Sequence, residues 1–254
     1  MKLEFSLDSQ SIKDALGILT SLADGEDDKR FDNILFHIKH DKLNLVATNN
    51  AAILIYSIPV TPTQTDIKFT VPKSIVRNLK KSLTDNPRTT IAINKNIYIN
   101  NISVPLKNEF PDYENTMSKY ISHKHRPVTV ATNAFLSSLR KACYAMSGKD
   151  LPPYAQIHIT NDTLTVTPGY YILFREFSVS MPCASDINIT LYFNLQLLLF
   201  YFRHLLSGDK TTMWIYKKAY PVVFSNSESG FTNPTYAVMP LRDPLLYIMP
   251  SNLA

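Results

Sequence analysis

The stretch IKFTVPKSIVRNLKKSL, residues 67–83, is the most informative part of the sequence, because a strand runs directly into a helix. Residues 67–71 mix β-branched and aromatic side chains, which favour a strand, and Pro72 suits the first turn of a helix. In the helix expected over 72–83, the apolar side chains recur at the helical period and share one face: Ile75, Val76, Leu79 and Leu83. The stretch therefore predicts an amphipathic helix that follows a strand and packs against a sheet.

The same order of a strand, a helix and three strands occurs four times along the chain. Helices are expected over 9–22, 72–83, 132–146 and 194–206, and the residues expected to cap three of them are Asp8 or Ser9, Thr132 or Asn133, and Phe193 or Asn194. The expected strands are 2–7, 33–38, 43–48, 53–59, 67–71, 89–94, 97–100, 102–106, 128–131, 156–159, 163–167, 171–178, 188–192, 211–216, 221–225 and 235–239. Repetition at a period of about 60 residues predicts an α+β fold of two similar domains, each with two helices packed on antiparallel sheets.

The repeats group into two predicted domains, residues 1–122 and 127–242, followed by a tail over residues 243–254. Residues 107–127 contain two prolines and few aliphatic side chains, so we expect an irregular connector there.

Composition and terminal sequences exclude several classes of protein. Hydrophobic residues make up 45% of the 254 residues and charged residues 19%, which favours a packed core over disorder. Two cysteines cannot build a disulfide framework or a cysteine zinc site, so a reducing compartment is expected. The longest apolar run, 195–202, is shorter than a membrane span, and residues 1–5 do not resemble a signal peptide. We therefore expect a cytoplasmic protein with no membrane partner.

Positive charge concentrates in the segments expected to be helical. Segment 73–83 carries four cations and segment 132–149 carries three, with no acidic residue in either. The four helical segments together carry a net charge of +8 and the whole chain carries +5, so the rest of the chain is net −3. An ordinary solvated helix mixes both signs, because Glu–Lys pairs four residues apart are favourable. The pattern predicts contacts to the phosphates of a polyanion, and charge alone leaves a merely solvated face as the alternative.

Several motifs, in order, resemble those of the bacterial sliding clamp, the beta subunit of DNA polymerase III. The stretch Tyr236-Ala237-Val238-Met239-Pro240-Leu241-Arg242 is similar to the Tyr-x-x-Met-Pro-x-Arg ending of that family. Further similar segments, over roughly residues 1–242, are 33–36, 41–43, 46–49, Val71-Pro72-Lys73, Glu109-Phe110-Pro111-Asp112-Tyr113 and Phe193-Asn194 with its leucine-rich helix. The fourfold repeat is also the domain plan of these clamps.

The resemblance implies a ring that encircles double-stranded DNA and slides along it without reading its sequence. Family chains have three domains and close as dimers, whereas this sequence contains two, so a six-domain ring implies a homotrimer rather than a homodimer. This shortened form is compatible with a phage or mobile-element origin. The edge strand of the first domain would pair with the edge of the last domain in the next chain. The residues that the resemblance places toward DNA are Lys13, Arg77, Lys80, Lys81, Arg140, Lys141, Lys149 and Arg203, whereas Lys73, at a helix start, is expected nearer the rim.

The resemblance also implies a hydrophobic pocket that takes short linear motifs from DNA polymerase, the clamp loader and repair enzymes. By motif position the first domain would contribute Thr48, Asn50, Ala51, Ile53, Pro72 and Val76. The second domain would contribute Asn194, Leu197, Val238, Met239, Pro240, Leu241 and Arg242. Family members carry His and Arg about where this chain has Ala51 and Ala52, which makes the pocket barer. For each apolar residue, plain core packing is the competing interpretation.

The tail after Arg242 departs from the family, whose chains tend to end near that point. Its apolar residues, 245–249, suggest that it packs beside or into the pocket as a competitor or an added interface.

No catalytic constellation, metal site or cofactor motif is evident, so we expect a protein that is not an enzyme. His37 and His40 lie three residues apart, and on a strand they would point to opposite faces. Three alternatives stay open: a clamp-fold scaffold that tracks DNA for transcription or repair, a monomeric nucleic-acid-binding protein, and a two-domain enzyme whose site the sequence does not reveal.

Overall fold

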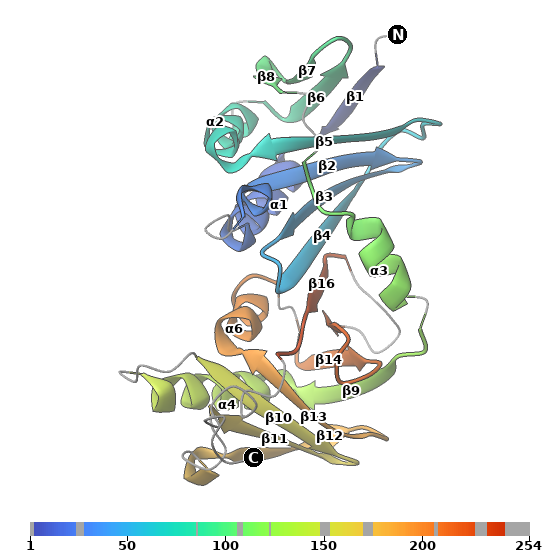
Figure 1. The fold of residues 1–254 in the computed structure, drawn as a ribbon. Coiled ribbons are helices and arrows are strands. Elements are labelled where there is room, and N and C mark those ends of the chain that lie inside the picture. Colours follow the sequence, from blue (N-terminus) through green and yellow to red (C-terminus); the bar gives the residue numbers. More distant parts are fainter. Residues whose placement is uncertain are drawn as a thin grey trace, which may run out of the picture. The chain divides into compact units, whose positions relative to one another are not determined.

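The computed structural model describes residues 3–23, 28–84, 86–105, 109–121, 123–147, 153–169, 175–205, 208–226 and 233–241. The chain divides into two compact units, Met1–Asn115 and Thr116–Ala254, and Figure 1 labels their elements. The domain limits expected from the sequence, 1–122 and 127–242, remain predictions. None of the described helices is long and apolar enough to cross a membrane.

The first unit contains two antiparallel sheets. One has the strand order β1-β6-β7-β8 and the other β4-β3-β2-β5. The elements, in chain order, are β1 (Leu3–Asp8), α1 (Ser9–Leu22), the 3₁₀ turn η1 (Lys29–Asp32), β2 (Asn33–Lys39), β3 (Lys42–Thr48), β4 (Ala52–Pro59), β5 (Asp66–Pro72), α2 (Lys73–Thr84), β6 (Arg88–Ile93), β7 (Ile97–Ile99) and β8 (Ile102–Val104). Helices α1 and α2 pack against each other; α1 also contacts β3 and β4, and α2 contacts β5.

The second unit repeats this order. Its elements are β9 (Arg126–Ala131), α4 (Thr132–Met146), β10 (Tyr154–Thr160), β11 (Thr163–Pro168), the 3₁₀ turn η2 (Arg175–Phe177), β12 (Val179–Ala184), β13 (Asn188–Asn194), α6 (Leu195–His204), β14 (Lys210–Ile215), β15 (Val222–Ser225) and β16 (Thr235–Val238). The strand order is β13-β10-β11-β12-β9-β14-β15-β16. Helices α4 and α6 pack together and both contact β10 (Figure 1). The predicted fourfold repeat and the mixed helix and antiparallel-sheet fold are therefore confirmed.

Matching hydrogen bonds in the two units show that the repeat is structural. The first residue of α1, Ser9, bonds through its hydroxyl to that of Thr89 in β6, with the oxygens 2.7 Å apart. The first residue of α4, Thr132, does the same with Thr211 in β14 at 3.0 Å. Because buried hydroxyls need partners, each pair fixes a helix start against the strand that follows the second helix of its unit.

The interior of each unit is built from strand and helix side chains. In the first unit the rings of Phe36 and Phe69 stack with centroids 5.2 Å apart between β2 and β5. In the second, Phe135 of α4 meets Phe202 of α6 edge to face at 5.4 Å. Each such apolar side chain contributes about 1.5–3 kcal/mol when it is buried. These contacts therefore help to hold β2 against β5 and α4 against α6.

Three expectations from the sequence are wrong in detail. The connector over 107–127 contains a helix, α3 (Tyr113–Ile121), which begins with the polar segment YENT. The strand expected over 171–178 is replaced by η2 and by β12, and residues 170–174 lie outside the described residues. Helix α4 has no side-chain cap, because its cap position is Ala131 and the hydroxyl of Thr132 is used by Thr211.

The other two predicted caps are present. The carboxylate of Asp8 accepts hydrogen bonds from the backbone N–H and the hydroxyl of Ser11, both at 2.7 Å. The Asn194 Oδ1 accepts a hydrogen bond from the backbone N–H of Gln196 at 2.8 Å. Each satisfies a donor that the first helical turn leaves open.

Candidate nucleic-acid and peptide interfaces

Helix α2 separates apolar and cationic side chains onto two faces. Val76, Leu79 and Leu83 are buried, whereas Arg77 and Lys81 are exposed. The helix carries no acidic residue, so its outer face presents positive charge alone. This is the arrangement that the sequence predicts for a surface that contacts phosphates.

The two other lysines of α2 reach toward α1. The Lys73 ammonium donates a hydrogen bond to the Ala23 carbonyl at 2.7 Å, where it meets the negative end of the α1 dipole. The half-buried Lys80 lies over α1, with its Nζ 3.8 Å from the point that a Cβ at Gly17 would occupy. Lys73 is therefore a helix-capping residue, and Lys80 adds its charge to the edge of the cationic face.

The remaining predicted DNA-facing residues lie on the other helices. Arg140 and Lys141 are exposed on α4, Arg203 is exposed near the end of α6, and Lys13 is half-buried on α1. Lys149 lies outside the described residues. In the part of the chain that the structure describes, ion pairs involve none of the seven other predicted cations: Lys13, Arg77, Lys80, Lys81, Arg140, Lys141 and Arg203. Their charges are thus available to a partner within each unit.

In the first unit, the strand register aligns several predicted pocket residues at one end of the β4-β3-β2-β5 sheet. Ile53 opposes Thr48 across β4 and β3, and Pro72 opposes Asn33 across β5 and β2. Thr48 closes the adjoining turn, since its hydroxyl donates to the Ala52 carbonyl at 2.7 Å.

Exposure of these residues is uneven. Asn50 is exposed with a φ of 69°, Ala51, Ile53 and Pro72 are half-buried, and Val76 is fully buried. The positive φ is the left-handed region, which asparagine tolerates better than most residues. Val76 therefore supports this surface from beneath, and the half-buried residues form its accessible part.

In the second unit, the segment after β16 runs beside β13. The backbone N–H of Leu241 donates to the Tyr192 carbonyl at 2.7 Å, which brings Leu241 within two residues of Asn194. Leu241 is 38% exposed, Asn194, Met239 and Pro240 are half-buried, and Leu197 and Val238 are buried. Arg242 and the tail over 243–254 lie outside the described residues.

Sequence reasoning missed two residues at this surface. Tyr192 supplies the carbonyl that holds Leu241, and the Lys218 ammonium lies 5.8 Å from the centre of the Tyr192 ring. Cation–π contacts of this kind stabilise exposed positions by about 0.5–1 kcal/mol. The alternation of side chains along β13 is the only sequence signal that could have placed Tyr192 at this surface. No local signal could have placed Lys218 there, because it lies in the turn after β14.

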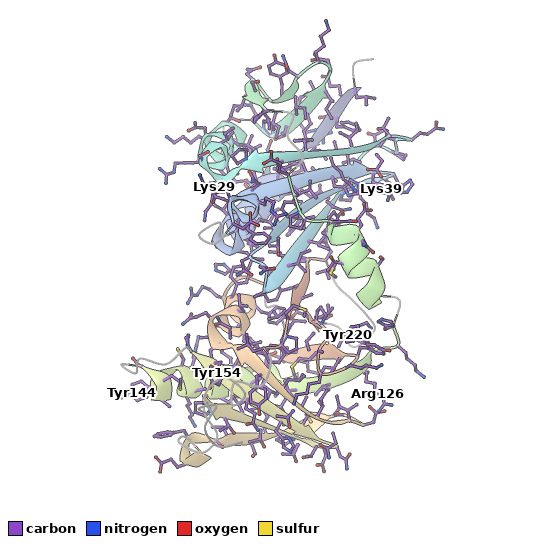
Figure 2. The ribbon with its side chains drawn as sticks, viewed as in Figure 1. Lys29, Lys39, Arg126, Tyr144, Tyr154 and Tyr220 are labelled. Carbon is purple, nitrogen blue, oxygen red and sulfur yellow. The ribbon has the colours of Figure 1, made fainter. Side chains whose placement is uncertain are left out.

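A buried polar network fastens the start of α3 to the first unit. The ring nitrogens of His37, which is fully buried, lie 2.5 Å from the Tyr113 hydroxyl and 2.8 Å from a carboxylate oxygen of Asp66. Glu114 accepts hydrogen bonds from Lys39 at 2.9 Å, labelled in Figure 2, and from Lys68 at 2.5 Å. Residues from β2, β5 and α3 thus meet in one cluster.

Burial and charge set the protonation states in this network. Burial lowers the pKa of His37, although Asp66 and Glu114 oppose that shift. Burial opposes ionisation of Glu114, but the ammonium groups of Lys68 and Lys39 outweigh it and lower the pKa of Glu114 to about 2. At neutral pH the network therefore contains neutral His37 and a carboxylate held by two lysines.

Ligand atoms of His37, Asp66 and Glu114 lie within 4.8 Å of one another, close enough to bind one metal ion. Lys39 and Lys68 already bind the Glu114 carboxylate, and their positive charges would repel a cation there. The arrangement fits an ion-pair network that positions α3.

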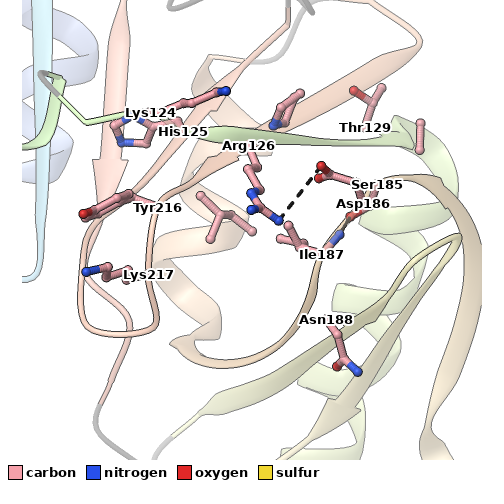
Figure 3. Close-up of a pocket in the computed structure, with 13 residues that line it drawn as sticks. Lys124, His125, Arg126, Thr129, Ser185, Asp186, Ile187, Asn188, Tyr216 and Lys217 are labelled. Atoms are coloured by element: carbon pink, nitrogen blue, oxygen red, sulfur yellow. Dashed lines mark hydrogen bonds and ion pairs between the residues drawn. The ribbon is translucent and has the colours of Figure 1, made fainter.

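The second unit has an open cavity of about 990 Å³ between the start of β9, the turn before β13 and the end of β14 (Figure 3). Among the described residues that line it, the one carboxylate is that of Asp186, which lies 4.0 Å from the Arg126 guanidinium. The Tyr216 ring stacks on His123 with centroids 4.1 Å apart, and Lys217 lies over its face. The cavity therefore presents cations and the Tyr216 ring, and its carboxylate lies near an arginine.

The duplicated units, each with two helices on antiparallel sheets, define the DNA-clamp class of fold. Solved structures that superpose on the chain include those of bacterial sliding clamps. The DNA polymerase III beta subunit of Thermotoga maritima matches with a TM-score of 0.78 and 14% identity, over 95% of this chain and 66% of that chain. A DNA polymerase sliding clamp of Pseudomonas aeruginosa matches with a TM-score of 0.79 and 15% identity, over the same shares.

The sliding clamp of Bartonella birtlesii, solved with griselimycin bound, matches with a TM-score of 0.76 and 18% identity, over 94% of this chain and 66% of that chain. No family model and no curated protein sequence matches the chain. The chain thus has the fold of the beta sliding clamp and spans about two thirds of the length of these structures. At 14–18% sequence identity, the superposition establishes a shared fold only.

Proposed function

We propose that the chain is a sliding-clamp subunit that encircles duplex DNA and tethers DNA polymerase and other partners to it. The observation that carries this proposal is the cationic outer face of α2, repeated by Arg140 and Lys141 on α4, in a fold shared with bacterial sliding clamps. Neither helix contains an acidic residue, so both faces suit the phosphates of a polyanion. Catalysis plays no part in this function, since tethering needs only topology and weak contacts.

The proposed ring contains three copies of the chain. A clamp ring of the family plan has six domains, and each copy of this chain supplies two units. Partners would bind through short hydrophobic motifs. The surface around Ile53 and Pro72 in the first unit and around Met239, Pro240 and Leu241 in the second supplies half-buried apolar side chains for such motifs.

A topology experiment tests encirclement. The purified protein is incubated with linear plasmid DNA, whose free ends let a ring thread on, and the ends are then joined by ligase. The product is passed through a large-pore sizing column at high salt. Phosphate contacts weaken steeply with salt, so only protein that encircles the plasmid should elute with it. Cutting the plasmid once should release that protein, because a ring slides off a free end.

Two results would contradict the proposal. Protein that stays with the plasmid after the cut is held by contacts and not by topology. Protein that forms rings in solution yet binds linear and circular DNA equally, with the same salt dependence, is a nucleic-acid-binding protein of another kind.

A further inference from the structure

The cationic face of α4 also carries an exposed aromatic ring. Tyr144 is 83% exposed and its ring projects outward from the helix (Figure 2). At 3.6 residues per turn it lies on the same face as Arg140 and Lys141, four and three residues earlier. The positive charges of Arg140 and Lys141 therefore lie one helical turn before the Tyr144 ring, on either side of it.

A second ring comes from the segment before β12. Phe177 in η2 is 45% exposed and lies across a shallow cavity of about 520 Å³ that α4 and η2 line together. The cavity residues that concern us, which we name the stacking patch, are Arg140, Lys141, Tyr144 and Phe177. Of the described residues that line the same cavity, one is acidic, Glu176.

The core does not explain the position of Tyr144. Helix α4 packs into the second unit through Phe135, Leu139, Ala142 and Met146, all buried on its opposite face. Within the described residues, the Tyr144 ring makes no hydrogen bond or ring contact. A large ring held in water beside two cations is therefore available to a ligand with both an aromatic surface and negative charge.

We propose that the stacking patch binds single-stranded nucleic acid. Arg140 and Lys141 would contact phosphates while an unpaired base stacks on Tyr144, which is how proteins hold single strands without reading sequence. Duplex DNA offers the phosphates but keeps the faces of its bases stacked inside, so it would use the cations and not the ring. The inference goes beyond encirclement of a duplex and does not depend on ring formation.

The test uses fluorescence anisotropy with three labelled probes of equal length: a thymidine oligonucleotide, the same backbone without bases, and a mixed-sequence duplex. Tyr144→Ala should weaken binding of the thymidine probe by about 5- to 150-fold, the range for loss of one base–aromatic stack. It should leave the abasic and duplex affinities within about twofold, because the phosphate contacts remain. Tyr144→Phe keeps the ring and should bind all three probes as the wild type does.

Glu176→Gln provides a control that should strengthen binding instead of weakening it. Removing the one acid from the cavity should strengthen binding of both single-stranded probes, and the Tyr144→Ala effect should persist in the double variant. Since Tyr144 and Glu176 are exposed, thermal unfolding of each variant should match the wild type.

Equal weakening of all three probes by Tyr144→Ala, or no weakening of any, would overturn the proposal. Displacement of the thymidine probe by an acidic peptide, but not by excess unlabelled oligonucleotide, would assign the patch to a protein partner instead. Failure of the plasmid experiment alone would remove encirclement and leave base-dependent binding at Tyr144 intact.

Discussion

At the scale of single residues, the clearest dependence on tertiary structure is the network around His37. Its ring nitrogens face Tyr113 and Asp66, and the neighbouring Glu114 joins Lys39 and Lys68 from two strands. These contacts hold the first turn of α3 against β2 and β5. Because the pKa of Glu114 is lowered in this network, we expect the stability of the first unit to depend on pH.

We expect Glu114→Gln to remove part of that pH dependence. Its folded-state pKa is about 2 against an ordinary value of 4.5, so the carboxylate stabilises the fold above pH 4.5 and this contribution is lost as pH falls toward 2. At pH 7 the variant should be less stable by about 1–2 kcal/mol, because two ammonium groups lose a charged acceptor that is partly exposed. Urea unfolding measured from pH 7 to pH 2 should show the difference shrinking as the pH falls below 4.5.

Glu109→Gln is the matched control for this prediction, because Glu109 is exposed and no described ion pair involves it. It should follow the wild-type curve at every pH. A constant difference between Glu114→Gln and the wild type down to pH 2 would show that the substitution acts through packing and not through charge.

At the scale of elements, the helices occupy equivalent positions in the repeat but differ in the charge of their exposed faces. Helices α1 and α4 begin at matching hydroxyl pairs, Ser9 with Thr89 and Thr132 with Thr211. Helix α2 carries four cations and no acid, whereas α1 carries one cation and one acid. Packing explains the repeated positions, and the unequal charges require a separate explanation such as contact with a polyanion.

The salt dependence of duplex binding should reveal the contribution of α2. Replacing Arg77 and Lys81 by alanine should lower the slope of log affinity against log salt by about 1.8, since each phosphate contact contributes about 0.9. Both side chains are exposed on a helix whose core face is untouched, so stability should change little. Filter binding of a linear duplex at several salt concentrations gives the slope.

The control for charge is the pair Lys42→Ala and Lys95→Ala. Both lysines are exposed at sheet turns of the same unit, so this variant loses the same net charge away from α2. An equal change of slope in both double variants would show that duplex binding follows overall charge and not the helix face.

At the scale of the whole molecule, the sheet edges are the features that matter for assembly. Within the described residues, β8 pairs only with β7, and Val179–Pro182 of β12 pair only with β11. Unpaired strand edges are the usual site of strand addition between chains. Such edges in both units allow copies of the chain to join head to tail, which closes into a ring when the rotation per copy is right.

We expect a homotrimer in solution. Three chains of 28.8 kDa give a particle of about 86 kDa, and light scattering across a concentration series should approach that mass. A particle of two chains would contradict a six-unit ring. A mass of one chain at all concentrations would leave the clamp fold intact but remove spontaneous ring formation.

The sequence was sufficient to predict the fourfold repeat of a strand, a helix and three strands, and the fold class, but not helix α3. In residues 67–83 and their three counterparts, apolar side chains recur first at the strand period of two and then at the helical period of 3.6. This pattern is local, so it can be recognised without knowing which elements pack together. The cationic faces of α2 and α4 are predictable for the same reason. Two of three expected caps are present, because a cap depends on residues within one turn.

Long-range contacts set the rest. Helix α3 forms in a segment with little periodicity because Tyr113 and Glu114 find partners 76 and 75 residues away, in His37 and Lys39. The cap expected at Thr132 is absent because Thr211, 79 residues later, takes its hydroxyl. The helical period places Tyr144 on the cationic face of α4, but only the tertiary structure shows that no other element of the described chain covers its ring, which is 83% exposed. Local pattern thus fixes where elements form, whereas burial and pairing across the chain fix which side chains remain available to a partner.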